Sequence, residues 1–284
     1  MRPLPGTQIE AAPRPAVAWG RPGTRSTGER MVEPKSGACG DGDPCRPCLL
    51  MIPGSFCDER LFAAQVRALN RKARLISADF SRLRDREAWL ARLLQRLPER
   101  FSVVGFSLGG LIALELLRRA PERVERLAMI ASNAEAATRR TDLRTRAQWR
   151  LWRQHGPLAA LQPVWPNYFG RARRLTRERA LVRRMAQATP AKSARAQLTW
   201  AAERPQGRST LASFQAPLLI VSGRRDRLCP RSAQQHMLRA QPHARWHELR
   251  HCGHLIPLEA PRRLGRLLAC WLAEPSDVSP RSSS

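Results

Sequence analysis

The sequence predicts an α/β fold, namely a doubly wound, mostly parallel sheet of about six strands with an inserted helical cap. Two observations predict the sheet. Short apolar segments alternate with amphipathic segments of helical period along residues 48–133, and the same alternation resumes over residues 216–273. A third observation predicts the cap, because residues 134–210 contain several helix-like pieces and no convincing apolar strand.

Each strand of this fold is expected from a short apolar run. The expected strands are residues 48–53, 73–80, 101–106, 124–132, 216–223 and 244–249. The expected helices between and after them are residues 57–70, 84–97, 108–120, 230–240 and 260–273. Because strands that alternate with helices run parallel, their carboxyl ends meet at one edge of the sheet, where such folds bind ligands.

The chain is expected to divide into a core, a cap and two tails. The core comprises residues 47–133 and 211–273, and the cap comprises residues 134–210. Residues 1–46 are rich in Pro, Gly, Arg and Ser, so we expect a disordered extension there and a disordered tail over 274–284. No apolar run approaches the roughly 18–20 residues of a membrane helix, and the N-terminus lacks a signal sequence, so we expect a cytoplasmic protein without membrane insertion.

The net charge of +27 is unusual, and all but three of the 50 basic residues are arginine. GC-rich codons explain such a bias without any function. The arginines are scattered and no nucleic-acid-binding motif accompanies them, so we expect no nucleic-acid partner. The functional alternative is that the arginines of the cap attract an acidic carrier protein or the carboxylate of a substrate. These arginines are Arg171, Arg173, Arg174, Arg177, Arg183 and Arg184.

One pair of cysteines has the spacing of a metal or redox motif, Cys45-x-x-Cys48. No second pair of this kind and no suitably placed histidine completes a set of four ligands. We therefore expect no metal and no cofactor.

The segment Gly105-Phe106-Ser107-Leu108-Gly109 matches the pattern G-x-S-x-G between an expected strand and an expected helix. Such a sharp strand-to-helix turn strains the serine backbone and needs small neighbours, because strand and helix approach closely there. It also exposes the serine hydroxyl at the ligand-binding edge of the sheet. Ser107 is therefore the candidate nucleophile, and a glycine-rich turn with an incidental serine is the alternative.

A serine hydroxyl needs a base, and the base needs an acid to orient it. His254 and His251 both follow the last expected strand, and we favour His254 because His251 stands at the strand end. Asp226 follows the strand 216–223 and lies between Ser107 and His254 in the chain, which is the order this fold uses. A turn-capping role is the alternative for Asp226.

Negative charge that develops on a substrate carbonyl needs backbone donors. The N–H groups of Ser55 and Leu108 are the candidates for this oxyanion hole. The candidates for substrate binding are Phe56, Trp149, Trp152 and Trp165, although aromatic residues of cap helices are often simply buried.

Four segments together resemble the signature blocks of bacterial α/β-hydrolases. They are LLMIPGSFCDERLF, VVGFSLGGLIALELLRRAPERVERLAMI, VSGRRDRLCP and HCGHLIPLEAP. The resemblance is greatest to carboxylesterases of the pimeloyl-carrier methyl ester esterase type. It implies hydrolysis of a small-molecule ester or thioester through an acyl-enzyme, with Ser107, His254 and Asp226 as the triad. One departure is Pro53-Gly54, where the family usually has His-Gly.

Other functions fit the same residues. A lyase, a haloperoxidase or an acyltransferase can keep this triad, because a fold does not fix a reaction. A basic protein that binds an anionic partner on a hydrolase scaffold is the non-enzymatic alternative. The sequence does not indicate the oligomeric state.

Overall fold

The computed structural model describes residues 46–170 and 175–275, and within them six strands form one sheet with the order β2-β1-β3-β4-β5-β6. The strands are β1 Cys48–Ile52, β2 Arg74–Ser77, β3 Phe101–Phe106, β4 Val124–Ile130, β5 Leu218–Gly223 and β6 Arg245–Leu249. Every neighbouring pair is parallel. The predicted sheet of about six parallel strands is therefore confirmed.

Burial explains why the strands read as apolar runs. All residues of β1, β3 and β5 are buried, whereas the edge strands β2 and β6 consist largely of half-buried residues. A central strand of a parallel sheet has helices on both faces, so both sets of alternating side chains must be apolar.

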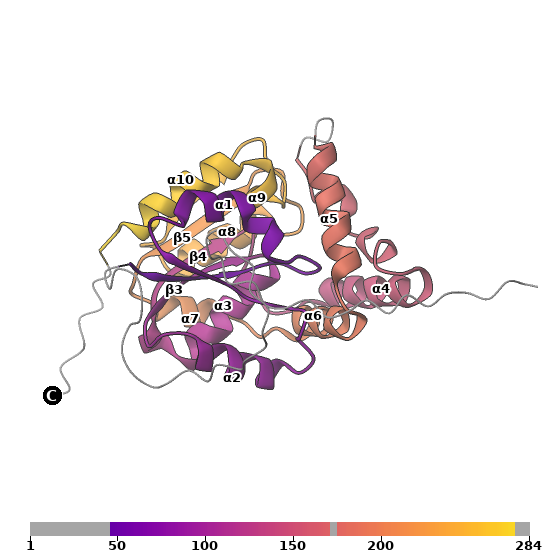
Figure 1. Cartoon of the computed structure of the whole chain (residues 1–284), viewed down its shortest axis with the longest axis horizontal. Coiled ribbons are helices and arrows are strands. Elements are labelled where there is room, and N and C mark those ends of the chain that lie inside the picture. Colours follow the sequence, from indigo (N-terminus) through magenta and orange to yellow (C-terminus); the bar gives the residue numbers. More distant parts are fainter. Residues whose placement is uncertain (1–45, 171–174, 276–284) are drawn as a thin grey trace, which may run out of the picture. The chain divides into compact units, whose positions relative to one another are not determined.

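Helices cover both faces of the sheet (Figure 1). One face packs against α1 Ala63–Leu69 and α10 Pro261–Leu272, through side chains that include Leu69 and Leu268. The other face packs against α2 Arg86–Arg96, α3 Leu108–Arg119, α7 Arg208–Ala212 and α8 Arg231–Ala240. Short turns of helix complete the core, namely η1 Glu59–Phe62, η2 Pro121–Arg123 and α9 Ile256–Glu259.

Between β4 and β5 the chain forms only helices and loops within the residues described. The helices are α4 Arg139–His155, η3 Ala159–Leu161, η4 Trp165–Asn167, α5 Thr176–Ala188 and α6 Ala191–Glu203, followed by α7. We call residues 134–210 the inserted segment. Helix α4 buries Thr141, Thr145, Gln148 and Trp152, which recur at helical spacing along one face.

The inserted segment packs on the core at two places. Trp200 of α6 lies edge-on to Trp89 of α2, with ring centroids 6.1 Å apart. Trp152 of α4 lies 5.3 Å from Phe56, in the loop after β1. The first contact seats α6 on α2, and the second brings α4 against the loop that follows the carboxyl end of β1.

Several sequence predictions fall outside the described residues. The extension lies there except for Arg46, as do most of the C-terminal tail and the first cysteine of the Cys45–Cys48 pair. Three of the cap arginines, Arg171, Arg173 and Arg174, also lie outside the described residues. Cys48 itself is buried in β1 with a free thiol. In the described part of the chain, no helix combines the length and apolar character that crossing a bilayer requires.

Candidate active site

Ser107 occupies the turn between β3 and α3, with a positive φ of 52° and a ψ of −114°. An L-residue seldom adopts this conformation, and strain of this kind clusters at functional sites. The turn is possible only because the residues two positions before and after Ser107 are glycines. A Cβ on Gly105 would lie 2.4 Å from the carbonyl oxygen of Gly109, and a Cβ on Gly109 would lie 2.1 Å from that of Ile52.

The strained turn is held by hydrogen bonds to the strand next to it. The N–H of Ser107 donates to the carbonyl of Ile130 at 2.9 Å, and the hydroxyl of Ser132 donates to the carbonyl of Ser107 at 2.8 Å. Both partners lie at the end of β4. The backbone of Ser107 is therefore fixed by contacts that do not involve its hydroxyl.

The structure brings Ser107, His254 and Asp226 together. The Nε2 of His254 lies 2.9 Å from the Oγ of Ser107, and its Nδ1 lies 2.8 Å from the Oδ2 of Asp226. The three residues follow β3, β5 and β6, whose carboxyl ends lie at the same edge of the sheet. The competing residue, His251, is exposed.

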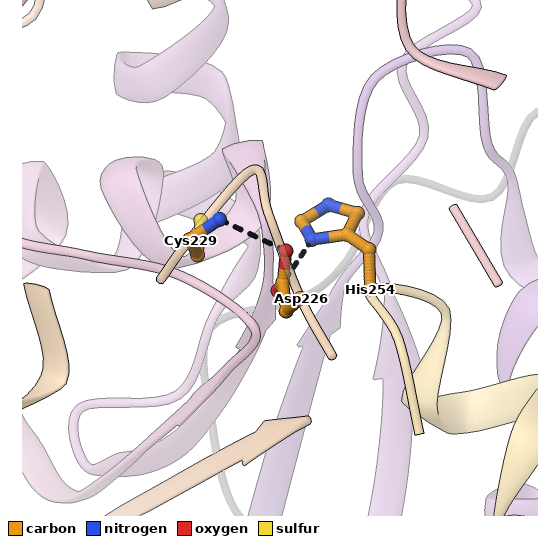
Figure 2. A group of neighbouring side chains, drawn as sticks. All are labelled: Asp226, Cys229 and His254. Atoms are coloured by element: carbon orange, nitrogen blue, oxygen red, sulfur yellow. Dashed lines mark hydrogen bonds and ion pairs between the residues drawn. The ribbon is translucent and has the colours of Figure 1, made fainter. Parts of the chain in front are cut away.

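The carboxylate of Asp226 is fully buried and held on both oxygens. Its Oδ1 accepts hydrogen bonds from the N–H groups of Leu228 at 2.8 Å and Cys229 at 2.9 Å. Its Oδ2 is thus left for His254, and Figure 2 shows Asp226 between Cys229 and His254. The imidazole can use its Nδ1 proton to satisfy Oδ2, so its Nε2 lone pair faces Ser107. This is the tautomer that can accept a proton from the hydroxyl.

Aromatic rings fix the plane of the imidazole. Tyr168 stacks on His254 with centroids 5.9 Å apart and an interplanar angle of 16°, and Phe106 lies 5.2 Å away. The carbonyl of Tyr168 also accepts the N–H groups of His254 and Leu255, both at 3.0 Å. Sequence reasoning did not predict that Tyr168 contacts His254, because no local motif marks a contact with a loop so far along the chain.

Glu259 is a second residue that sequence reasoning missed. Its Oε2 accepts the N–H of Gly170 at 2.7 Å and its Oε1 accepts that of Gly253 at 2.8 Å. Burial raises the pKa of this carboxyl, although the two backbone donors oppose the shift. Glu259 thereby joins the inserted segment to the loop that carries His254. The spacing of six residues from Gly253 was visible in the sequence, but the contact with Gly170 was not.

One group of side chains in the described residues could in principle hold a metal ion. Ligand atoms of Asp226, Cys229 and His254 lie within 4.8 Å of one another. Burial raises the pKa of the Cys229 thiol to about 12, so this thiol is neutral at pH 7 and a poor ligand. Both oxygens of Asp226 and the Nδ1 of His254 are already used in hydrogen bonds. Asp226 and His254 are therefore arranged to hydrogen-bond with each other and with Ser107, and not to bind a metal ion.

The loop after β1 lies against the candidate nucleophile. A Cβ on Gly54 would come within 2.8 Å of the Phe106 ring and 3.2 Å of the Cβ of Ser107. The loop turns tightly, because the N–H of Cys57 donates to the carbonyl of Gly54 at 3.1 Å. Ser55 follows Gly54 directly, and Leu108 begins α3 directly after Ser107. Both predicted donors therefore belong to backbone next to Ser107.

The four predicted substrate-binding aromatics are placed differently. Phe56 and Trp152 touch and are buried in the core cluster. Trp165 is half-buried, 6.2 Å from the ring of Tyr168 and thus one ring removed from His254. Trp149 faces Arg195 of α6 at 6.0 Å. Trp152 thus packs on the loop after β1 through Phe56, and Trp165 packs near Tyr168, whereas Trp149 faces another helix of the inserted segment.

Known proteins are similar to this chain in sequence or in fold. The chain is 32% identical over 188 residues to a pimeloyl-[acyl-carrier protein] methyl ester esterase of Aromatoleum aromaticum, covering 62% of this chain and 75% of the relative. It is 29% identical over 241 residues to the protein of the same name from Nitrosomonas europaea, covering 76% and 92%. The structure of an esterase from Thermogutta terrifontis superposes with a TM-score of 0.70 at 22% identity, covering 80% of this chain and 89% of that one.

The family model described as "Alpha/beta hydrolase family" matches residues 40–267, which include the sheet and all three residues that meet at its edge. The match spans most of the chain and agrees with the family that the four sequence blocks predicted. The chain therefore belongs to the alpha/beta hydrolase family.

Proposed function

We propose that the protein hydrolyses a carboxylic ester or thioester through an acyl-enzyme, with Ser107 as nucleophile, His254 as base and Asp226 as the supporting acid. The observation that carries this proposal is the unbroken chain of hydrogen bonds from Ser107 through His254 to Asp226, at 2.9 and 2.8 Å. The names of two curated relatives, both methyl ester esterases, support the same reaction class.

The geometry suggests how each step proceeds. As Ser107 Oγ attacks the carbonyl carbon, its proton passes to His254 Nε2, and Asp226 stabilises the imidazolium that results. The N–H groups of Ser55 and Leu108 stabilise the oxygen that becomes negative. His254 then gives the proton to the departing alcohol or thiol. Water attacks the acyl group on Ser107 with His254 again as base, which releases the acid.

We further propose that the inserted segment acts as a cap over this site and receives esters that carry a negative charge, such as those on an acidic carrier protein. Arg179 and Arg183 of α5 lie over the ring of Trp165, at 5.6 and 5.2 Å. In the described ranges neither arginine forms an ion pair with a carboxylate, and Trp165 lies 6.2 Å from Tyr168, which itself stacks on His254. Arg177, Arg183 and Arg184 are exposed on the same helix, so their charge is available to a partner.

The described cysteines beside the site, Cys57 and Cys229, carry free thiols. Free thiols suit the reducing cytoplasm, where we propose that the enzyme acts.

The first test is labelling with a fluorophosphonate probe, followed by hydrolysis of p-nitrophenyl esters of increasing acyl length. We expect the native protein to be labelled and to release free acid, and Ser107→Ala to do neither. Ser102→Ala is the matched control, because Ser102 is buried in β3 away from the turn. Labelling that persists in Ser107→Ala would refute the assignment, and transfer of the acyl group to an added alcohol in place of hydrolysis would identify an acyltransferase.

A second test concerns the charge of the substrate. For an ester on an acidic carrier, we expect KM to rise several-fold between low and physiological ionic strength, because exposed charges are screened over about 8–10 Å. For a neutral p-nitrophenyl ester, KM should not change. Equal salt dependence for both substrates would contradict the proposed role of the arginines of α5.

A further inference from the structure

The loop that carries the proposed oxyanion donor Ser55 contains a second strained residue. Phe56 has a positive φ of 59°, a backbone conformation that is strained for a bulky L-residue. Its side chain is 1% exposed, so solvent does not hold the backbone in this state. Some other contact must hold it.

That contact comes from the inserted segment. The N–H of Phe56 donates to the Oε1 of Gln197 at 2.8 Å, across 141 residues of sequence, and Gln197 is completely buried in α6. A buried backbone N–H that loses its acceptor is left unsatisfied, which is energetically costly, so this bond resists rotation of the peptide between Ser55 and Phe56.

The orientation of Gln197 is itself determined. A backbone N–H can only donate, so the amide oxygen of Gln197 must face Phe56 and its nitrogen must face the other way. The Nε2 of Gln197 donates to the Oγ of Ser193 at 2.9 Å, one turn earlier on α6. The hydroxyl of Ser193 in turn donates to the carbonyl of Phe80, in the core after β2. This chain of directed hydrogen bonds joins the core, α6 and the oxyanion loop.

We propose that Gln197 is a positioning residue for the oxyanion hole, which holds the Ser55–Phe56 peptide in its strained conformation so that the N–H of Ser55 points at the reacting carbonyl. Without the bond, Phe56 can relax toward negative φ, which rotates the adjoining peptide and displaces Ser55. Because Gln197 belongs to α6, the oxyanion hole is complete only when this helix is seated on the core. The inference rests on the proposed function, since it assumes that Ser55 serves as a donor.

The test compares two identical substitutions in buried glutamines of the inserted segment. Gln197→Leu removes the acceptor for Phe56. Gln148→Leu is the matched control, because Gln148 is buried in α4 and donates to Ala160 within the inserted segment. With a neutral p-nitrophenyl ester, we expect Gln197→Leu to lower kcat by about tenfold to a hundredfold with KM within about twofold, since a displaced catalytic group costs that much. Gln148→Leu should leave both constants within about twofold.

Amide hydrogen exchange supplies a readout that does not depend on the substrate. We expect exchange in the peptide that covers residues 53–57 to be at least about tenfold faster in Gln197→Leu and unchanged in Gln148→Leu, because only the first substitution frees a buried N–H. Should Gln197→Leu fail to fold, Ser193→Ala, which frees the amide of Gln197 to rotate, should give the same changes to a smaller extent.

The outcomes separate this inference from the proposed function. If native protein neither cleaves esters nor reacts at Ser107, the proposed function fails, and the exchange rates still decide whether Gln197 holds the loop. If native protein is an active esterase while folded Gln197→Leu keeps native kcat and native exchange in residues 53–57, the role of Gln197 is refuted.

Discussion

At the scale of single residues, the site separates the group that must react from the groups that must stay fixed. Ser107 has a fixed backbone, and its hydroxyl hydrogen-bonds to Nε2 of His254, whereas Asp226 is fully buried and held by two backbone N–H groups and His254. A buried carboxylate with three donors orients the imidazole without taking its proton. The precision of the site therefore depends as much on Leu228 and Cys229, which hold the acid, as on the acid itself.

Substitution of Asp226 by Asn tests this orientation. Asn has the same shape, and its oxygen can still accept the N–H groups of Leu228 and Cys229, but its amide nitrogen would donate to Nδ1 and place the imidazole proton on Nε2. We expect kcat for an ester to fall by about 10⁴-fold with little loss of stability. Asp142→Asn, in an exposed ion pair with Arg146, is the control and should leave kcat unchanged. Equal activity of the two variants in steady-state assays would rule out the proposed role of Asp226.

At the scale of elements, the turn between β3 and α3 leaves no room for a side chain at Gly105 or Gly109. We expect Gly109→Ala to abolish activity and to lower the free energy of unfolding by about 3 kcal/mol, because the new Cβ would meet the backbone of β1. Gly156→Ala is the comparison. Gly156 ends α4 with a positive φ of 81° but has open space around it, so the cost should be about 1–2 kcal/mol of strain, with activity intact. Urea unfolding and ester hydrolysis measure the two effects, and an active Gly109→Ala would contradict this account of the turn.

The sequence predicted the elements of the core well, because apolar period and glycine placement depend on local physics. It predicted their boundaries less well. The helix expected over residues 57–70 is a 3₁₀ turn followed by α1, since Asp58 caps the chain at Glu59 and the loop before it is tied to Gly54. The helix expected over 260–273 is confirmed as α10 Pro261–Leu272, whereas the separate short helix before it, α9 Ile256–Glu259, was not predicted.

The residues that the sequence could not predict act across long sequence distances. Gln197 meets Phe56 and Glu259 meets Gly170, and neither contact leaves a local pattern. Ser107, Asp226 and His254 were predictable because the parallel sheet places all strand ends at one edge, so position relative to a strand is enough. Side chains that join the inserted segment to the core follow no such rule.

At the scale of the whole molecule, one buried and one half-buried side chain connect the inserted segment to the loops of the site. Gln197 reaches the loop after β1, and Glu259 connects Gly170 to the loop that carries His254. Movement of the inserted segment during substrate entry would therefore disturb the proposed oxyanion donor and the proposed base together. We therefore expect the proposed site to be complete only while the inserted segment is seated on the core.

Glu259 makes this connection dependent on pH, and the sign follows from its raised pKa. Burial disfavours the charged carboxylate, so the folded state binds the proton more tightly than the unfolded chain. The stabilising contribution of this group is therefore fully present below the unfolded pKa near 4.5, and it is lost as the pH rises through the higher folded pKa. Above that pH the contribution is constant.

The comparison with Glu259→Gln isolates this contribution, because glutamine does not titrate. We expect the free energy of unfolding of the native protein, minus that of the variant, to decrease from pH 4 to pH 7 by about 1.4 kcal/mol for each unit by which the pKa is raised. Urea unfolding of both proteins across this range measures the difference. A difference that grows with pH would mean that the two N–H groups of Gly170 and Gly253 stabilise the charge more than burial opposes it, which would reverse the assigned direction.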